Sequence, residues 1–511
     1  MGAIEENALP VIGLEVHVEL ATETKMFCRC LNRFGDPPNT HTCPVCIGMP
    51  GVLPVMNRRA VEYAMKVGLA LNCRVPDFTK WDRKSYYYPD LPKNYQISQY
   101  DLPLNVGGYL EVPLSGGRTK RIGIIRAHLE EDAGKNVHEL PGHTGVDLNR
   151  AGVPLLEIVS EPHMNSVEEV MAFARWMQRL VRWLGVSGAN MQMGQMRFEP
   201  NISLWVGPVP APQSSPEGVL LPVEDFDESV GFFTPIFEVK NLNSFRALER
   251  TCQWVIDYHR TQLAERGRAW SLAEVGKQNW GWREDLNACE FQRGKEEAHD
   301  YRYFPEPDLV PVVVDDTWRQ RVRAEIGELP LPRKRRYLSD YGLTEKEADA
   351  LTQDPATGDL LDEAVAAGAE PKRVVNLLLG RGAAIANERG CAIAEVGVSA
   401  EQLAGLARML AEGRVNATAA DRIFEKMAVE GGEPEAIAEA EGLLAVSDAG
   451  QIAAWVDRAI AENPQAVADV KAGGKKQKKA FGFLMGQVMR LSGGAAVPAE
   501  VQKLLRERLG Q

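Results

Sequence analysis

The sequence of 511 residues lacks long hydrophobic runs, and no segment approaches the roughly 20 consecutive apolar residues that a membrane-spanning helix requires. Residues 1–10 are acidic and contain no hydrophobic stretch, so a secretory signal is not expected. Cysteine is scarce, with eight residues, and the four that lie beyond position 70 are scattered, which argues against a disulfide framework. These absences favour a cytoplasmic protein that does not associate with membranes.

The sequence also lacks a G-x-x-x-x-G-K-[ST] motif, which excludes a phosphate-binding loop of the P-loop class. With 58 basic and 70 acidic residues its net charge is −12, which gives no overall bias toward nucleic acids. Two local basic runs remain, 333–336 (RKRR) and 475–479 (KKQKK). Each is either a solvated face or a contact to phosphate groups, and the runs alone leave both readings open.

Hydrophobic patterning predicts an α+β fold for the first part of the chain. Residues 10–305 are rich in glycine, proline and aromatics, and short β-like runs alternate with amphipathic helical stretches, which indicates a large antiparallel sheet. Ser166 and Glu169 have the spacing of a capping box at the start of a helix. The expected strands are 11–20, 121–128, 202–206 and 236–239, the expected helices are 57–71 and 167–184, and 211–217 is an expected exposed loop.

Composition changes after the proline-punctuated segment 303–311 and the LPLP sequence at 329–332. From there alanine, glutamate, leucine, arginine and glutamine dominate, which predicts helices with glycine and proline as stops. A second break falls near 430–434, and the remainder suits a small helical bundle. We therefore predict three domains: 1–305, a helical domain at 306–435, and a helical tail at 436–511.

Two short cysteine spacings near the start of the chain predict a zinc site. Cys28 and Cys30 form C-x-C, Cys43 and Cys46 form C-x-x-C, and twelve residues separate the two pairs. Four thiolates satisfy the tetrahedral shell of Zn²⁺ completely, so such a site is closed and structural. The alternative is four unrelated reduced thiols.

An acidic strand just upstream suggests a second metal site. Glu15, His17 and Glu19 alternate and share one face of the expected strand, although a solvated sheet edge has the same pattern. Further carboxylates occur at 130–132 (EED) and at Glu157, which apolar residues flank. Buried carboxylates need a counter-charge, and magnesium binds to a few carboxylates while it keeps water and phosphate oxygens.

Several cations are candidates to bind phosphate near these acids, and the aromatic run 85–95 (SYYYPDLPKNY) either stacks on a base or packs as a loop. The candidate cations are Lys84, Lys93, Lys135 and Arg150, with Arg83 beside the first.

Seven segments, in order and over essentially the whole chain, resemble the GatB family, the B subunits of aspartyl/glutamyl-tRNA(Asn/Gln) amidotransferases. They are VIGLEVHVEL (11–20), CPVCIGMPGVLPVMN (43–57), WDRKSYYYPDLPKNYQISQYDLP (81–103), RAHLEEDAGK (126–135), DLNRAGVPLLEIVSEP (147–162), FEVKNLNSFRALER (237–250) and KEEAHDYRYFPEPDL (295–309).

The resemblance implies a cradle-shaped α+β domain, a helical domain, and a tail domain similar to the YqeY fold. It also implies that the helical and tail domains bind tRNA. It implies an ATP-dependent carbon–nitrogen ligase with glutamine as the nitrogen donor. The enzyme would phosphorylate the side-chain carboxylate of Glu-tRNA(Gln) or Asp-tRNA(Asn), and ammonia would then displace phosphate. The implied partners are mischarged tRNA, the A subunit, which is the glutaminase, and the C subunit, in a heterotrimer.

By the same resemblance the implied cofactors are ATP, Mg²⁺ and Zn²⁺, and the four cysteines hold the zinc. The basic run near the end becomes a tRNA phosphate contact. The catalytic and magnesium set is Glu15, His17, Glu131 and Glu157, with Glu130 as a competitor of Glu131, and the tRNA contacts are Lys475, Lys476, Lys478 and Lys479.

The sequence departs from the family pattern within 190–203, where the usual segment reads MQEGSLRCDANIS. Met193, Gln195, Phe198 and Glu199 replace Glu, Ser, Cys and Asp of that pattern. The tail segment 491–498 also differs from the frequent GKANP-like stretch. The departures within 193–200 favour the main alternative, a non-catalytic, zinc-stabilised tRNA-binding scaffold, whereas the changed tail segment would weaken contact with tRNA. An unrelated magnesium-dependent carboxylate ligase is a third reading.

Overall fold

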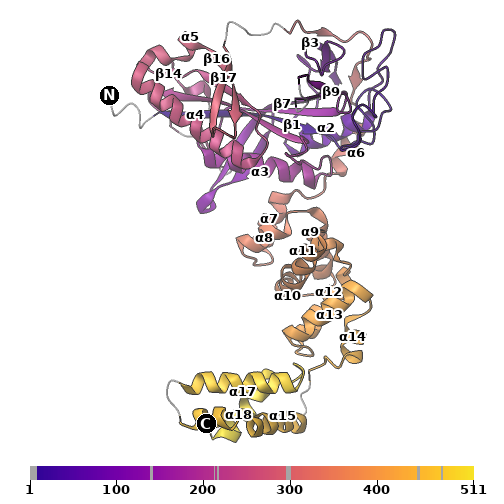
Figure 1. The fold of residues 1–511 in the computed structure, drawn as a ribbon, viewed down its shortest axis with the longest axis vertical. Coiled ribbons are helices and arrows are strands. Elements are labelled where there is room, and N and C mark those ends of the chain that lie inside the picture. Colours follow the sequence, from indigo (N-terminus) through magenta and orange to yellow (C-terminus); the bar gives the residue numbers. More distant parts are fainter. Residues whose placement is uncertain are drawn as a thin grey trace. The chain divides into compact units, whose positions relative to one another are not determined.

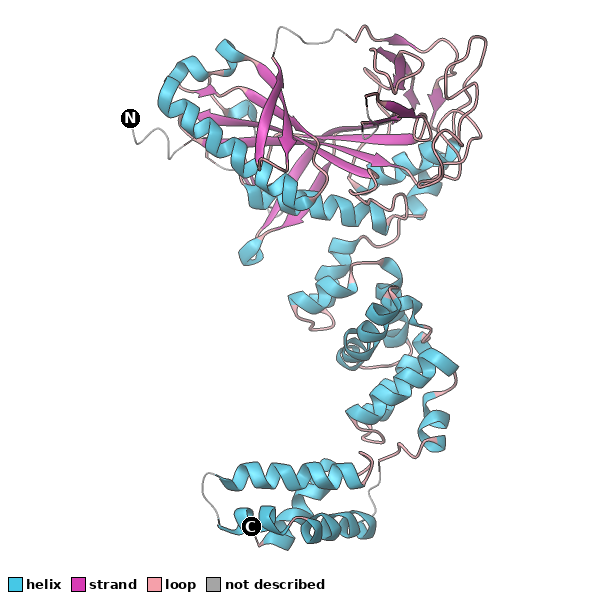
Figure 2. Ribbon diagram, viewed as in Figure 1, coloured by secondary structure: helices cyan, strands magenta, loops and turns pink. Residues whose placement is uncertain are grey.

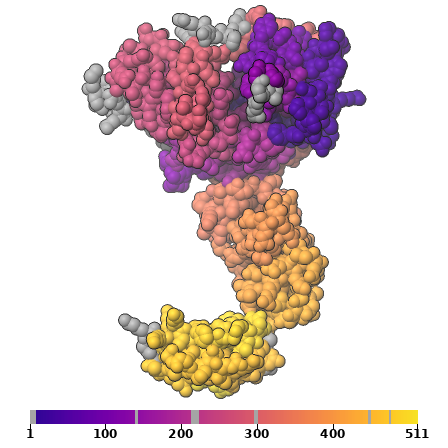
Figure 3. Space-filling view, viewed as in Figure 1, coloured from indigo at the N-terminus to yellow at the C-terminus, as the bar shows by residue number. Residues whose placement is uncertain are grey.

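The computed structural model describes residues 8–138, 142–211, 213–215, 218–221, 223–294, 301–445, 449–472 and 476–510. Contacts within the chain divide it into two compact units, Met1–Leu329 and Pro330–Gln511, which can be followed by colour in Figure 3. This division falls later in the chain than the predicted boundary at 305. None of the helices in the described ranges is long and apolar enough to cross a membrane.

The first unit is built on one large sheet, whose described strands pair antiparallel except β15 and β16, which are parallel. A parallel pair needs a crossover connection, which α4 (Phe245–Arg266) supplies. The strand order is β17 (Ala288–Arg293), β16 (Lys277–Arg283), β15 (Ile236–Lys240), β11 (Met196–Val206), β1 (Leu9–Glu19), β10 (Pro154–Ser160), β7 (Thr119–Glu131) and β5 (Asn105–Val106), with β14 (Phe232–Phe233) beside β11 and β6 (Tyr109–Pro113) beside β7.

Smaller sheets and further helices complete this unit (Figure 1). The small sheets are β18 (Phe304–Pro305) with β3 (Asp82–Ser85) and β4 (Tyr95–Ser98), β19 (Val312–Val313) with β2 (Phe78–Thr79), β8 (Lys135–Val137) with β9 (Gly145–Asp147), and β12 (Gln213–Ser215) with β13 (Gly218–Leu220). The other helices are α2 (Arg58–Ala70), α3 (Val167–Trp183), α5 (Leu272–Val275) and α6 (Asp316–Ala324).

The central strand β1 separates an apolar face from a polar face of the sheet. Val16 and Val18 are fully buried, whereas the intervening residues Glu15, His17 and Glu19 are half-buried on the other side. Helices α2, α3 and α4 pack against the sheet and cover its apolar face (Figure 1). The alternation therefore places the predicted acidic face where helices do not cover it.

The expected elements occur, with two local corrections. Asn57 caps α2 by accepting from the backbone N–H groups of the first turn, and Ser166 Oγ accepts from Glu169 N at 3.2 Å. The capping box is nevertheless incomplete, because the Glu169 carboxylate instead accepts from Lys120 Nζ at 2.8 Å and from Asn165 N at 2.6 Å. The expected loop 211–217 contains strand β12, while residues 212 and 216–217 lie outside the described residues.

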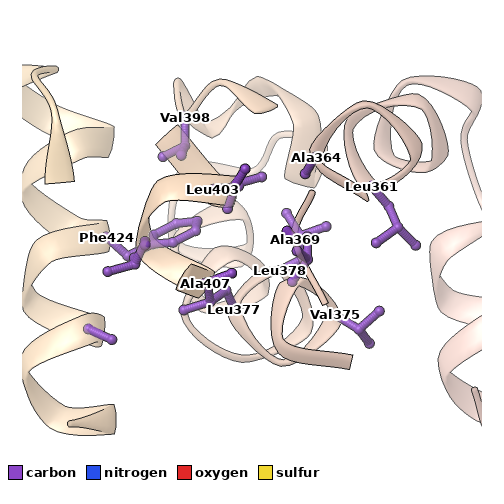
Figure 4. Packing of buried hydrophobic residues seen from close by; sticks show 14 of the residues in the cluster. Leu361, Ala364, Ala369, Val375, Leu377, Leu378, Val398, Leu403, Ala407 and Phe424 are labelled. Atoms are coloured by element: carbon purple, nitrogen blue, oxygen red, sulfur yellow. The ribbon is translucent and has the colours of Figure 1, made fainter. Parts of the chain in front are cut away.

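The second unit contains helices and no strands in its described ranges (Figure 2), which confirms the predicted fold class. Phe424, Leu403 and Leu361 are fully buried where α12 packs against α9 and α13 (Figure 4). Its helices are α7 (Pro330–Ser339), α8 (Glu345–Leu351), α9 (Pro355–Ala366), α10 (Pro371–Leu377), α11 (Ala383–Arg389), α12 (Ala400–Ala411), α13 (Ala417–Glu430), α14 (Pro434–Ala440), α15 (Ala449–Glu462), α16 (Pro464–Ala472), α17 (Gln477–Leu491) and α18 (Pro498–Leu509).

The basic run 333–336 is part of this packing. Arg333 and Lys334 are buried, and the Arg333 guanidinium contacts Asp359 at 2.6 Å. Lys334 Nζ lies 2.8 Å from a carboxylate oxygen of Glu345. Arg336 pairs with Asp362 at 2.7 Å. Three residues of the run therefore have acidic partners within the unit, which supports a structural role for the run.

Candidate metal centres

The polar face of the large sheet brings two histidines and two glutamates together from three adjacent strands. His17 of β1 lies opposite Glu157 of β10, and Glu157 lies opposite His128 of β7. His17 Nε2 is 3.4 Å from a carboxylate oxygen of Glu157 and 3.6 Å from one of Glu130. The ligand atoms of His17, Glu130 and Glu157 lie within 4.8 Å of one another, which makes this trio a candidate metal centre.

The electrostatics of the trio are those of a site that attracts cations. Burial disfavours the imidazolium of His17, but its hydrogen bond to Glu157 and the charge of that carboxylate outweigh burial and raise its pKa to about 9. Burial, followed by repulsion from Glu157, raises the pKa of Glu130 to about 7. Burial lowers the pKa of His128 to about 4, so this second imidazole is neutral.

A divalent cation fits these residues. Two carboxylates supply the oxygen ligands that Mg²⁺ prefers, and His17 can complete one face of the shell once the cation displaces its proton, while water and phosphate oxygens occupy the rest. The Nδ1 atoms of His17 and His128 are buried without a hydrogen-bond partner among the described residues. Binding of a cation would offset the repulsion between the carboxylates of Glu130 and Glu157.

The trio lines a polar cavity of about 420 Å³. Lys84 of β3 enters this cavity and is placed between aromatic rings, with Nζ 4.9 Å from the ring centre of Tyr301 and 5.8 Å from that of Tyr86. Burial opposes its charge, but Glu130, Tyr303 and Glu157 raise the pKa of Lys84 above its usual range. Of the four predicted phosphate-binding cations, Lys84 alone lines this cavity.

Glu131 and Lys93 lie on the other side of β7. The Glu131 carboxylate pairs with Lys93 and accepts from Ile97 N at 2.9 Å, and both side chains line a separate cavity of about 200 Å³ beside Cys28 and Cys46. Successive residues of a strand point to opposite faces, so Glu130 and Glu131 cannot both face His17. We therefore place Glu130, in preference to Glu131, in the candidate metal centre.

Glu15, Lys135 and Arg150 are also outside the trio. Glu15 lines the same cavity but accepts from Asn201 Nδ2 at 3.0 Å, and burial followed by Glu157 raises its pKa. Arg150 donates to the carbonyl oxygens of Ala133 and Gly134 at 3.0 and 2.7 Å, and it lines a third cavity, of about 600 Å³, with Lys135.

The four predicted cysteines meet in a second candidate metal centre. Their sulfur atoms lie within 4.8 Å of one another, and the Sγ atoms of Cys43 and Cys46 are 3.9 Å apart. Four thiolates at the Zn–S distance of about 2.3 Å in a tetrahedron have S···S separations of about 3.8 Å. The geometry of Cys28, Cys30, Cys43 and Cys46 therefore fits Zn²⁺ and leaves no position open for a substrate.

A buried lysine supports this thiolate cluster. Lys25 is fully buried, and its ammonium group donates to His41 O at 2.7 Å, to Leu148 O at 3.3 Å and to Cys46 Sγ at 3.8 Å. Hydrogen bonding from Cys28, together with the smaller contribution of Lys25, lowers the pKa of Cys46 to about 5 against the effect of burial. A zinc ion bound by four thiolates carries net negative charge, and Lys25 offsets part of it.

The departures from the family pattern leave the trio intact. Met193 lines the about 600 Å³ cavity and not the metal cavity. Phe198 is buried on the apolar side, 5.8 Å from the ring of Phe245. Glu199 lines the metal cavity but keeps a carboxylate, which pairs with Lys240 at 3.1 Å. Gln195 accepts from Asn190 N at 3.2 Å in the turn before β11.

Sequence reasoning missed several residues of the metal cavity. Arg126 and His128 precede Glu130 at alternate positions of β7 and share its face, so strand periodicity could have found them. Tyr301 and Tyr303 carry no such signal, because pairing of β18 with β3 brings them there from a distant part of the chain.

Together, the fold and its sites define a two-unit protein: a mixed sheet carries a candidate metal centre and a thiolate cluster, and a helical unit follows. The family model described as the GatB/GatE catalytic domain matches residues 10–320, and that described as the GatB domain matches residues 359–509. The chain belongs to the GatB family.

Close relatives match over almost their whole length. The B subunit of aspartyl/glutamyl-tRNA(Asn/Gln) amidotransferase from Carboxydothermus hydrogenoformans is 43% identical over 505 residues, covering 98% of both chains. The protein of the same name from Moorella thermoacetica is 44% identical over 502 residues, and that from Trichlorobacter lovleyi 42% over 500, each covering 98% of this chain and 99% of the relative.

Proposed function

We propose that this chain is the subunit of a tRNA-dependent amidotransferase that activates the side-chain carboxylate of mischarged Glu-tRNA(Gln) or Asp-tRNA(Asn) with ATP. The observation that carries the proposal is the trio of His17, Glu130 and Glu157, which shares one polar cavity with Lys84. Family membership and the relatives' names support the choice of substrates. The partners that we propose are tRNA, the C subunit, and the A subunit, which is the glutaminase.

The chemistry requires charge neutralisation at two steps. An oxygen of the side-chain carboxylate attacks the γ-phosphorus of ATP, the bond to the β–γ bridging oxygen breaks, and ADP leaves with the electron pair. Ammonia then attacks the carbonyl carbon of the acyl phosphate; inorganic phosphate leaves and the nitrogen gives up a proton, so that a carboxamide forms. A bound magnesium ion supplies Lewis-acid neutralisation of phosphate oxygens.

The chain's own residues position these charges. His17, Glu130 and Glu157 would hold the cation at a fixed place on three strands, so that little rearrangement would be needed during the reaction. Lys84 presents an ammonium group whose position the tyrosine rings set. The closed thiolate centre takes no part in the chemistry and stabilises the neighbouring loops.

The test is reconstitution with the two partner subunits, followed by an assay of phosphate release and amide formation on both mischarged tRNAs. We expect magnesium-dependent ATP cleavage that requires charged tRNA, with uncharged tRNA and correctly charged Gln-tRNA(Gln) as controls. A complex that binds tRNA but cleaves no ATP in response to mischarged tRNA would support the scaffold alternative and contradict the proposal.

We further propose that the second basic run contacts tRNA. Lys476, Lys478 and Lys479 are exposed at the start of α17, and Lys475 lies outside the described residues. Positive charge at a helix N-terminus is opposed by the helix dipole, so this placement reduces helix stability and is better explained by an anionic partner.

Replacing Lys475, Lys476, Lys478 and Lys479 with alanine is expected to weaken tRNA binding. The slope of log K against log salt should decrease in magnitude by about 0.7–0.9 for each phosphate contact removed. Filter binding across a salt series measures the affinity for tRNA and the salt slope. K503A is the control variant, because Lys503 is exposed on α18. An unchanged affinity and slope would identify the run as a solvated face.

A further inference from the structure

The metal cavity contains two cations that form no ion pair with an acidic side chain of the described residues. Three other cations of the cavity are paired: Arg197 with Asp132 at 2.8 Å, Lys240 with Glu199 at 3.1 Å, and Lys277 with Glu238 at 2.7 Å. Lys84 and Arg126 line the same cavity, and neither forms an ion pair or a hydrogen bond within the part of the chain that the structure describes.

Arg126 is held beside the metal trio by the register of β7. It lies opposite Val159 of β10 and Val106 of β5, which offer it no polar side chain, and it precedes His128 and Glu130 on the same face. Its Nε is buried without a partner. A buried donor without a hydrogen bond is costly, so an acceptor from a ligand would stabilise this arrangement.

Lys84 is fixed by a different kind of contact. Its ammonium group lies over the faces of Tyr301 and Tyr86, while Ser85 N donates to Tyr301 O at 2.8 Å and so anchors the tyrosine segment to β3. Arg83 secures the same segment through two hydrogen bonds to Glu306, at 2.7 and 2.9 Å. Ring faces hold an ammonium group without using its N–H donors, which remain for a ligand.

The two cations differ in the anion that they suit. A guanidinium is planar and matches the two oxygens of a carboxylate with parallel hydrogen bonds, whereas an ammonium acts as a point charge that serves any phosphate oxygen. Both line the cavity that contains the candidate metal centre. The cavity therefore has one cation that suits a planar carboxylate and another that suits a phosphoryl group.

We propose that Arg126 binds the side-chain carboxylate of the amino acid carried by the tRNA, and that it thereby selects the acidic substrate over the amide product. This inference rests on the proposed function. A carboxylate accepts both guanidinium hydrogen bonds, but a carboxamide has one acceptor oxygen and an NH₂ group that would face the guanidinium donors. Amidation thus removes the interaction that held the substrate and favours release of the product.

The experiment compares R126Q and R126K with the wild type in the reconstituted complex. Steady-state phosphate release gives KM for Glu-tRNA(Gln) and for ATP, and filter binding gives Kd for the tRNA charged with glutamate and with glutamine. We expect R126Q to raise KM for Glu-tRNA(Gln) by about 10- to 100-fold and to bring the ratio of the two Kd values close to one. R126K should recover part of the preference, and KM for ATP should stay within about twofold.

R118Q is the matched control, because Arg118 is exposed just before the same strand and pairs with Glu168 on the surface at 3.1 Å. Zinc content and circular dichroism verify folding of every variant. The inference would be overturned if R126Q kept the wild-type preference for tRNA charged with glutamate over tRNA charged with glutamine. It would also be overturned if R126Q raised KM for ATP in parallel, because that result would assign Arg126 to the nucleotide. A wild-type complex without ATP cleavage on mischarged tRNA would instead overturn the proposed function.

Discussion

H17A and E130Q are each expected to reduce ATP cleavage on mischarged tRNA by at least about 10²–10³-fold in the reconstituted complex, the effect of removing one preorganised electrostatic group. His17 and Glu130 come from different strands, and His17 Nε2 lies 3.6 Å from Oε1 of Glu130. Each supplies one of the three proposed protein ligands, so loss of either would leave too few to hold a cation beside the phosphate. Glutamine hydrolysis should survive at least in part, because the proposed function assigns that chemistry to the A subunit. Binding of tRNA should also persist.

Transfer of labelled γ-phosphate, with and without charged tRNA, measures this loss. E131Q is the informative comparison, because Glu131 is adjacent in sequence but faces the other cavity. We expect E131Q to leave the magnesium dependence near that of the wild type, whereas E130Q should require much higher magnesium for any residual activity. Wild-type activation in both H17A and E130Q would place the metal centre elsewhere.

C43S is expected to lose zinc and to fold in much lower yield. Binding of structural zinc contributes about 10–16 kcal/mol in small zinc domains at neutral pH, which is comparable with the whole free energy of unfolding of a typical domain. The two cysteine pairs lie in different parts of the long connection between β1 and α2, and their sulfur atoms lie within 4.8 Å of one another. Loss of the metal would therefore leave these parts of the connection unlinked.

Elemental analysis of the purified chain should give about one zinc per molecule in the wild type. C391S is the control, since Cys391 packs beside the helical core and is remote from the cluster in sequence. K25M should retain zinc but release it faster to a chelator, because Lys25 donates to Cys46 Sγ. Full zinc retention in the double variant of Cys43 and Cys46 would refute the assignment.

Strand periodicity predicted the polar face of the sheet but could not select among consecutive acids. Glu130, Glu131 and Asp132 are three consecutive acidic residues, and residue type alone does not distinguish them. Only the pairing of β7 with β10 determines that Glu130 faces His17. The resemblance pointed to Glu131, one residue away, which in a strand means the opposite face.

Charge was a weaker guide than periodicity. Of two similar basic runs, 333–336 lies among acidic partners of its own unit, while the described lysines of 475–479 are exposed. Sequence could not separate them, because Asp359 and Asp362 approach α7 only through the packing of α9. Strand periodicity could have placed Arg126 on the face of Glu130, but the sequence does not show that no acidic side chain pairs with it among the described residues.

The thiolate cluster has a consequence for the order in which the two metal sites form. The cysteine loops bind the segment before β10 through main-chain and side-chain bonds: Met26 N donates to Gly152 O at 2.8 Å, and His41 N donates to Asn149 Oδ1 at 2.8 Å. Strand β10, which carries Glu157, begins directly after that segment. Chains synthesised under zinc starvation should therefore also lack an assembled carboxylate site, so that zinc supply would limit the pool of competent enzyme even when magnesium and ATP are abundant.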